Sequence, residues 1–306
     1  MTRLSESNAT RHPATWRVWL SWLAPWFFVE GALTYALGAG MAHFLRDVEG
    51  NRFWLGLLSV WWSQLLVLFL SEAFATPLPR GYESPPEGPW SAAEAGRRRA
   101  LWAALALLVA QVVTLSALVW LGAPWLALFT LALLTGLGVF YAIPPLRLAV
   151  SGYGEWAAAL AMGGLIPWAG FILQWGAWHR FLGLALVPLM SLYLAVQLAR
   201  EFPAYAWDRR HGVRNLLQRV DWQRGLMLHH LFLASAFLFL ALDLLVGWPW
   251  EVGAPAMLAL FPAMGEVWLL ERMAQGQKPL WSGLRRLSAA TFALTVYLLA
   301  LGFWLH

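Results

Sequence analysis

The sequence has no cysteine and little charge, and these two absences narrow the classes of protein it can be. Without cysteine among its 306 residues, the chain has no disulfides, cysteine-ligated metals or thiol nucleophiles. Charged residues make up only 12% and hydrophobic residues 60%, whereas soluble domains carry about 25% charged residues. We therefore expect an all-α, polytopic membrane protein. The net charge of +5 is spread along the chain, which is typical of the loops of a membrane protein. We therefore expect no nucleic-acid partner.

Nine apolar stretches are long enough to cross a bilayer, which takes about 20 mostly apolar residues. Pro25 lies inside the first stretch and predicts a kink there. We expect a cytoplasmic tail over 1–15 and a single nine-helix transmembrane domain over 16–306. The nine predicted spans cover 16–43, 53–75, 99–121, 124–143, 153–175, 180–199, 225–246, 252–271 and 286–305.

Basic residues fall mostly on one side of these nine spans. Eighteen of the 21 lie on the side of the N-terminus, and only Arg46, Arg52 and Arg180 lie on the other. Because basic loops stay in the cytoplasm, we predict a multi-pass protein of the cell (inner) membrane, surrounded by membrane lipids. The N-terminus is then cytoplasmic and the C-terminus lies outside. The long charged loops 76–98 and 200–224 both fall on the cytoplasmic side.

The stretch from 197 to 215 interrupts the apolar pattern with acids and arginines. Glu201 and Asp208 are seven residues apart, close to two helical turns, so they can share one helix face. Carboxylates flanked by guanidinium groups suit Mg²⁺ bound together with phosphate oxygens. The alternative is that a membrane helix simply ends here and cytoplasmic charge begins.

Other acids at predicted helix ends allow a structural or a functional interpretation. Glu72 ends the second span, and Arg80 follows it in a Pro/Gly-rich loop. Glu155 lies in the first turn of the fifth span, where a negative charge caps the helix dipole. Ser91 and Glu94 have the spacing of a capping box that opens the third helix.

Three segments together resemble the UbiA superfamily of intramembrane prenyltransferases, nearest to the branch that prenylates 1,4-dihydroxy-2-naphthoate in menaquinone synthesis. They are YAIPPLR from Tyr141, GYGE from Gly152, and EFPAYAWDRRHGVRNL from Glu201. The resemblance implies a nine-helix bundle around a cytoplasm-facing cavity. It further implies Mg²⁺-dependent transfer of a polyprenyl group from its diphosphate to an aromatic quinone precursor or another small lipid acceptor.

The resemblance also implies roles for individual residues. Glu72, Glu201 and Asp208 would be catalytic and would bind Mg²⁺; Arg80, Arg147, Arg200 and Arg214 would bind the diphosphate; and Tyr141 and Tyr205 would line the prenyl and acceptor pocket. The chain departs from the family pattern where Arg200 replaces Asn, Ala204 replaces Asp and Val213 replaces Lys. Of the first acidic motif only Glu72 is an acid.

Two alternatives stay open beside the prenyltransferase. A catalytically weakened homologue would bind an isoprenoid or quinone without transfer. A transporter or channel would place its ionisable residues near the bilayer midplane. Here the acids gather at cytoplasmic helix ends, with Glu30, Asp243 and Glu266 as exceptions. No base for the acceptor is identified, although His211 and Tyr153 are candidates.

Overall fold

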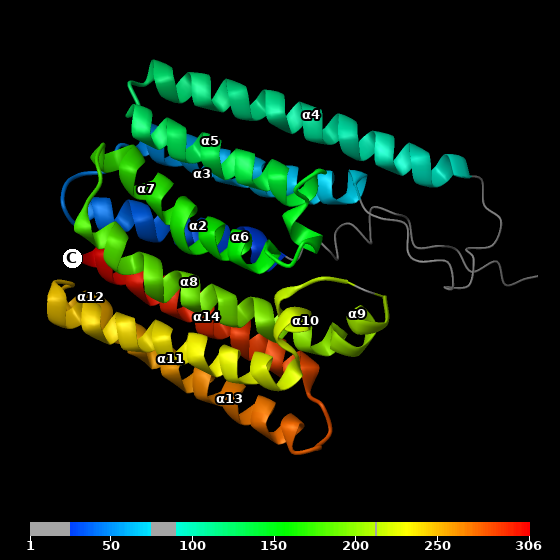
Figure 1. Cartoon of the computed structure of the whole chain (residues 1–306). Coiled ribbons are helices and arrows are strands. Elements are labelled where there is room, and N and C mark those ends of the chain that lie inside the picture. Colours follow the sequence, from blue (N-terminus) through cyan, green and yellow to red (C-terminus); the bar gives the residue numbers. More distant parts are fainter. Residues whose placement is uncertain (1–24, 75–89, 212) are drawn as a thin grey trace, which may run out of the picture.

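The computed structural model describes residues 25–74, 90–211 and 213–306 as a bundle of helices that run along a common direction (Figure 1). The long helices are α2 (Pro25–His43), α3 (Gly50–Ala73), α4 (Trp90–Trp120), α5 (Trp125–Ala142), α8 (Arg180–Glu201), α11 (Trp222–Val246), α13 (Leu260–Ala274) and α14 (Trp281–Leu305). The expected all-α membrane architecture is confirmed.

Eight helical segments in the described residues are long and apolar enough to cross a membrane. The segment over 154–175 joins α6 (Gly154–Leu160), the π-helical turn η2 (Ala161–Leu165) and α7 (Ile166–Trp175). A second composite joins α12 (Trp250–Gly253), η4 (Pro255–Ala259) and α13. The helix α2, 19 residues long, packs in the bundle but is not one of the eight, and residues 16–24 lie outside the described part. The count of nine and the kink at Pro25 therefore stay predictions.

Successive helices alternate in direction, so the connections gather at two ends of the bundle. One end, here called the α9–α10 end, carries α9 (Tyr205–His211), α10 (Leu216–Val220) and the α5–α6 connection with η1 (Leu148–Val150) (Figure 1). The C-terminus and α12 lie at the opposite end. Among the basic residues of the described chain, those next to the element ends gathered there are Arg46 after α2, Arg52 in the first turn of α3 and Arg180 at the start of α8. This distribution matches the sequence prediction, and the orientation in the membrane stays a prediction.

Small residues let neighbouring helices approach closely, as in other membrane bundles. A Cβ atom on Gly38 of α2 would lie 1.9 Å from the backbone oxygen of Pro167 in α7. A Cβ atom on Gly163 in η2 would lie 2.6 Å from the backbone nitrogen of Met190 in α8. These contacts fix α2, α7 and α8 around the centre of the bundle.

Buried polar side chains join helices that the apolar core alone would leave free to slide. Gln111 of α4 donates hydrogen bonds to Ser59 of α3 at 2.7 Å and to Thr135 of α5 at 3.0 Å. His229 of α11 lies 3.3 Å from the Glu266 carboxylate of α13, and both side chains are buried. Such contacts inside a membrane bundle hold helices in register.

The start of the predicted third helix agrees broadly with the sequence. The helix α4 begins at Trp90, next to the expected cap at Ser91. The side chains of residues 91–95 lie outside the described ones, so the capping box with Glu94 stays a prediction.

Candidate functional site

The chain remains almost continuously helical beyond the end of α8, which keeps Glu201 and Asp208 near one another. Glu201 is the last residue of α8, the 3₁₀ turn η3 (Phe202–Ala204) follows, and α9 begins at Tyr205. Asp208 lies close enough to Glu201 for their charges to interact. The expectation that this spacing brings the two acids together is therefore met.

Hydrogen bonds from the start of α10 and its N-cap hold both acids in place. The Asn215 side-chain amide donates to the Asp208 carboxylate at 2.9 Å. The Asn215 side-chain oxygen accepts from the backbone N–H of Gln218 at 2.8 Å and so caps α10. The backbone N–H of Leu217 donates to Glu201 Oε2 at 3.1 Å. The first turn of α10 thereby fixes α9 against the end of α8.

Glu155, which the sequence indicated as a helix cap, lies inside this group of acids. It belongs to the first turn of α6 and is 6% exposed. Its carboxyl is within hydrogen-bonding reach of the Glu201 carboxyl. Tyr141, at the end of α5, lies close enough to Glu155 and Glu201 to interact electrostatically with both. Sequence reasoning missed this role because an acid in a first helical turn has a sufficient local explanation.

Arg200, expected to bind diphosphate, is paired with an acid within the bundle. Its Nη2 atom lies 2.7 Å from Glu30 Oε1 of α2, and the Glu30 side chain is 2% exposed. Arg200 also donates to Gln197 at 3.2 Å and lies 5.9 Å above the ring of Tyr193. An acid within an apolar span needs such a partner, so Glu30 itself was the sequence signal for this pair.

Glu72 is not brought together with the other two acids of the expected Mg²⁺ triad. It is exposed in the last turn of α3. Within the described ranges, no three acidic or histidine side chains lie close enough together to hold one metal ion. The expectation of one ion bridging Glu72, Glu201 and Asp208 is thus not met by this geometry. The reason is that the end of α3 is tied elsewhere: Arg97 and Arg147 donate to the Ala73 and Phe74 carbonyl oxygens.

The remaining predicted site residues fall in three different settings. Arg147 caps the end of α3, as described above. Arg214 is exposed immediately before Asn215, and Arg80 lies outside the described residues. Tyr205 donates a hydrogen bond to Asp221 and packs edge-on against the Trp222 ring at 5.6 Å. It therefore faces the start of α11, and only Tyr141 of the two predicted pocket tyrosines faces the acids.

Arg219 ties α10 to the connection between α5 and α6. It donates to the Ser151 carbonyl oxygen at 2.6 Å and lies 4.2 Å above the Tyr153 ring. The hydrogen bond from Arg219 lowers the pKa of the Tyr153 hydroxyl. Gly152 has a positive φ of 79°, where a Cβ atom would meet Arg219 at 2.3 Å. The Gly-Tyr-Gly turn is therefore shaped to receive this arginine.

The residues present are suited to one divalent cation rather than two. Glu155 and Glu201 bring two carboxyl groups together, and Glu155 Oε2 is buried without a hydrogen-bond partner. Mg²⁺ in proteins usually takes one or two carboxylates and completes its coordination with water and phosphate oxygens. The chemistry of this donor set fits one such ion, with the ligands differing from the predicted triad.

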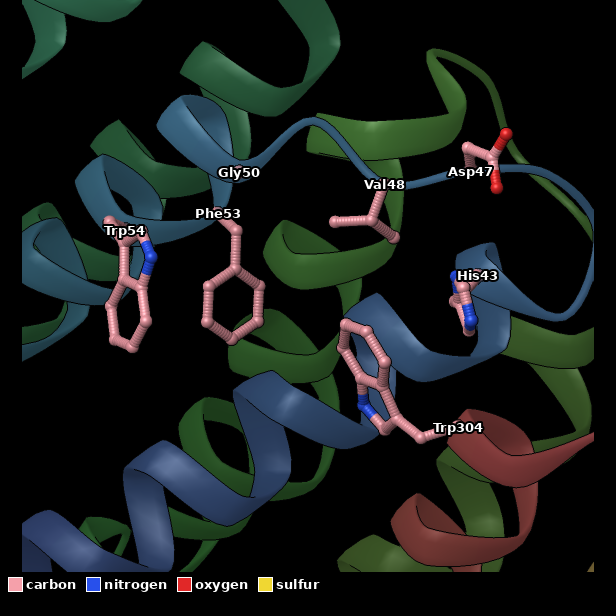
Figure 2. A pocket seen from close by; sticks show the side chains of 7 residues that line it. All are labelled: His43, Asp47, Val48, Gly50, Phe53, Trp54 and Trp304. Carbon is pink, nitrogen blue, oxygen red and sulfur yellow. The ribbon is translucent and has the colours of Figure 1, made fainter.

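A pocket at the opposite end of the bundle has a different character (Figure 2). Its volume is about 480 Å³, and its lining residues are His43, Asp47, Val48, Gly50, Phe53, Trp54 and Trp304. The imidazole of His43 stacks on the Trp304 ring at 4.8 Å. This largely aromatic pocket contains none of the predicted site residues.

Comparison with solved structures gives several matches over nearly the whole chain. A UbiA homologue from Archaeoglobus fulgidus bound to GPP and Mg²⁺ has a TM-score of 0.64 at 18% identity, and the match covers 90% of this chain and 97% of that one. The apo structure of a UbiA homologue from Aeropyrum pernix K1 has a TM-score of 0.63 at 12% identity, covering 90% and 96%. A structure of digeranylgeranylglyceryl phosphate synthase has a TM-score of 0.65 at 11% identity, covering 91% and 94%.

The chain has the UbiA fold. At identities of 11–18% this likeness establishes the fold alone. No family model matches the sequence, and no curated protein does either.

Proposed function

We propose that this protein is a UbiA-type membrane prenyltransferase that moves a prenyl group from its diphosphate to a small acceptor at the α9–α10 end. The observation that carries the proposal is the group of Glu155, Glu201 and Asp208 beside Tyr141, built on a fold shared with a protein bound to GPP and Mg²⁺. Acids at one end of an apolar bundle suit a substrate with an anionic head and a long apolar tail. The tail can remain among apolar helices while its diphosphate meets the polar end.

In the proposed reaction the bond between C1 of the prenyl group and the diphosphate oxygen breaks, and the bonding pair leaves with the diphosphate. The nucleophilic atom of the acceptor bonds to C1 and loses a proton. A bound Mg²⁺ would neutralise charge that develops on the departing diphosphate. Arg214 is exposed immediately before Asn215, which donates to Asp208, and it would contact phosphate oxygens directly.

Tyr141 would complete the site from the apolar side. Tyr141 lies in the last turn of α5, close to Glu155 and Glu201. The C1 atom of a bound prenyl diphosphate would lie beside its ring. Aromatic faces attract cations, with a worth of about 0.5–2 kcal/mol, so this ring would favour positive charge on the allylic carbon. The closely packed helices would keep water away from that carbon.

Two acceptor classes are consistent with this chemistry. The resemblance of the 141–216 segment favours an aromatic quinone precursor such as 1,4-dihydroxy-2-naphthoate. The digeranylgeranylglyceryl phosphate synthase structure favours a glycerol-phosphate lipid. We propose the aromatic acceptor, because the motif resemblance lies in the segments that build the site.

The test is a transfer assay on the purified full-length chain in lipid nanodiscs, with radiolabelled geranylgeranyl diphosphate and each acceptor in turn. We expect Mg²⁺-dependent prenylation of the aromatic acceptor, with release of diphosphate, and a loss of about 100-fold for Asp208→Asn, the lower end of the range of about 10²–10³ for a lost electrostatic stabiliser. Arg209→Gln, an exposed change one residue away, is the matched control. Transfer to the lipid acceptor alone would reassign the substrate.

The second candidate function is isoprenoid or quinone binding without transfer. The observation that favours it is the engagement of Arg200 by Glu30, which removes one expected diphosphate ligand. In that case, the protein would bind labelled isoprenoid with micromolar affinity but release no diphosphate with any acceptor.

A further inference from the structure

The pocket at the end of the bundle away from the acids has a composition that the proposed transferase does not use (Figure 2). Three helices line it with aromatic rings: His43 of α2, Phe53 and Trp54 of α3, and Trp304 of α14. Asp47, from the connection between α2 and α3, adds a carboxylate to this lining. A volume of about 480 Å³ is within the usual range of about 300–1,000 Å³ for small-ligand sites.

The aromatic walls of this pocket are held in place by the fold. Phe53 meets Trp304 edge-on at 5.9 Å and Trp54 edge-on at 5.2 Å, and His43 stacks on Trp304 at 4.8 Å. The Trp304 indole N–H donates to the Ala36 carbonyl oxygen at 2.9 Å. Trp54 is 66% exposed. The rings are therefore arranged before a ligand binds, which lowers the entropic cost of binding.

One negative and one positive side chain lie side by side in the chain at this pocket. Arg46 and Asp47 are both exposed, and neither forms an ion pair with another side chain in the described ranges. The nearby Arg52 is engaged elsewhere, since it pairs with Glu49 at 2.8 Å and donates to the Leu121 carbonyl oxygen at 2.8 Å. The fold therefore provides no basic partner for Asp47 from Arg52.

Exposed tryptophans indicate the depth at which the pocket lies. Trp120 ends α4, Trp125 begins α5 and Trp250 begins α12, all at the same end of the bundle as the pocket (Figure 1). These three side chains are 64–93% exposed. Because tryptophan gathers at the interface between membrane and water, the pocket lies at the level of the lipid headgroups.

We propose that this pocket binds the headgroup of a zwitterionic, amine-bearing phospholipid. Its ammonium group would lie among Phe53, Trp54 and Trp304, because aromatic faces attract ammonium ions. Asp47 would accept a charge-assisted hydrogen bond from the ammonium, and Arg46 would contact the phosphate. An anionic headgroup without an amine would leave Asp47 without a partner. The inference does not rest on the proposed function, since the acids lie at the other end of the bundle.

The test compares two lipids that share a phosphate and differ in the amine. The full-length chain in detergent is titrated with phosphatidylethanolamine or phosphatidylglycerol of identical acyl chains, and bound lipids are counted by native mass spectrometry. Asp47→Asn and Trp54→Ala should each weaken binding of the first phosphatidylethanolamine about fivefold, as for one lost ion pair or cation–ring contact, and leave phosphatidylglycerol binding unchanged. Glu251→Gln and Trp120→Ala, an exposed acid and an exposed tryptophan at the same end, are the matched controls and should bind both lipids as the wild type does.

Trp54→Phe separates the aromatic face from the size of the side chain, and it should keep most of the affinity that Trp54→Ala loses. Unchanged phosphatidylethanolamine binding in Asp47→Asn or Trp54→Ala would overturn the inference, as would an equal loss for phosphatidylglycerol or for the control variants. Soluble phosphoethanolamine, titrated in the same way, should bind far more weakly than the lipid. If it binds equally tightly and depends on Asp47, the ligand is a soluble amine and the assignment to a lipid is wrong. Each variant must match the wild type in elution volume.

Discussion

The ion pair between Arg200 and Glu30 provides a quantitative test of how α8 is held against α2. The two atoms lie 2.7 Å apart, and the side chains are 36% and 2% exposed, respectively. Removing one partner of a buried pair costs about 3–5 kcal/mol, because the other charge is left without a partner. The two single changes should therefore differ in the free energy of unfolding.

Arg200→Gln leaves the Glu30 carboxylate in a site with almost no access to water, so we expect the full loss of about 3–5 kcal/mol. Glu30→Gln leaves a guanidinium that is more than one third exposed and still hydrogen-bonded to Gln197. Because water can solvate the exposed guanidinium in place of Glu30, we expect a smaller loss of about 1–2 kcal/mol. The order of the two losses is the prediction.

The measurement is equilibrium unfolding in mixed detergent micelles, followed by the fluorescence of the many tryptophans, for both single variants and the double variant. A double-mutant cycle should give a coupling of at least about 1 kcal/mol, above the roughly 0.3–0.5 kcal/mol expected for independent sites. Arg209→Gln, exposed at the same end, is the control. Equal losses for the two single variants, or additivity in the cycle, would refute this account of the pair.

Three further predictions concern other parts of the bundle. His229→Leu should lower the free energy of unfolding by about 1–3 kcal/mol, measured as above, because it leaves the buried Glu266 carboxyl, 3.3 Å away, without its polar neighbour; no measurable loss would contradict this. The hydrogen bond from Tyr205 lowers the pKa of Asp221. Protection of segment 205–221 from proteolysis should therefore be full above a pH of about 4 and be lost as the pH falls through that lowered pKa. The Tyr205→Phe variant should lose this protection at a higher pH. Gly38→Leu should abolish the peak of folded protein in size-exclusion chromatography, because its Cβ alone would lie 1.9 Å from a backbone oxygen of α7; Gly183→Leu, with open space around it, is the control.

The sequence predicted the bundle well because the bilayer requires each spanning helix, taken by itself, to be apolar over a sufficient length. Apolar length and the side preference of arginine can be read along the chain without knowing which helices touch. The second to ninth predicted spans therefore recur as the eight segments of the described chain that are long and apolar enough to cross a membrane. The π-helical turn at Ala161–Leu165 was not foreseen, because an apolar pattern does not distinguish it from an α-helix.

The site was less predictable, because its charges depend on contacts between distant helices. Glu201 and Asp208 could be paired from their spacing on nearly continuous helices. Glu72 could not be placed, since its distance from Glu201 depends on how α3 ends, and Arg147 helps to hold that end. Glu155 had a local explanation as a cap, so nothing in the sequence required it to meet Glu201.

The pairing of acids within the bundle separates structural roles from the candidate functional role. Glu30 lies opposite Arg200, and Glu266 lies opposite His229, so each of these acids has a basic partner within the fold. Glu155 and Glu201 lie opposite each other. The partners of Glu30 and Glu266 therefore give these two acids a structural role within the bundle. Glu155 and Glu201 stay the acids on which the proposed function rests.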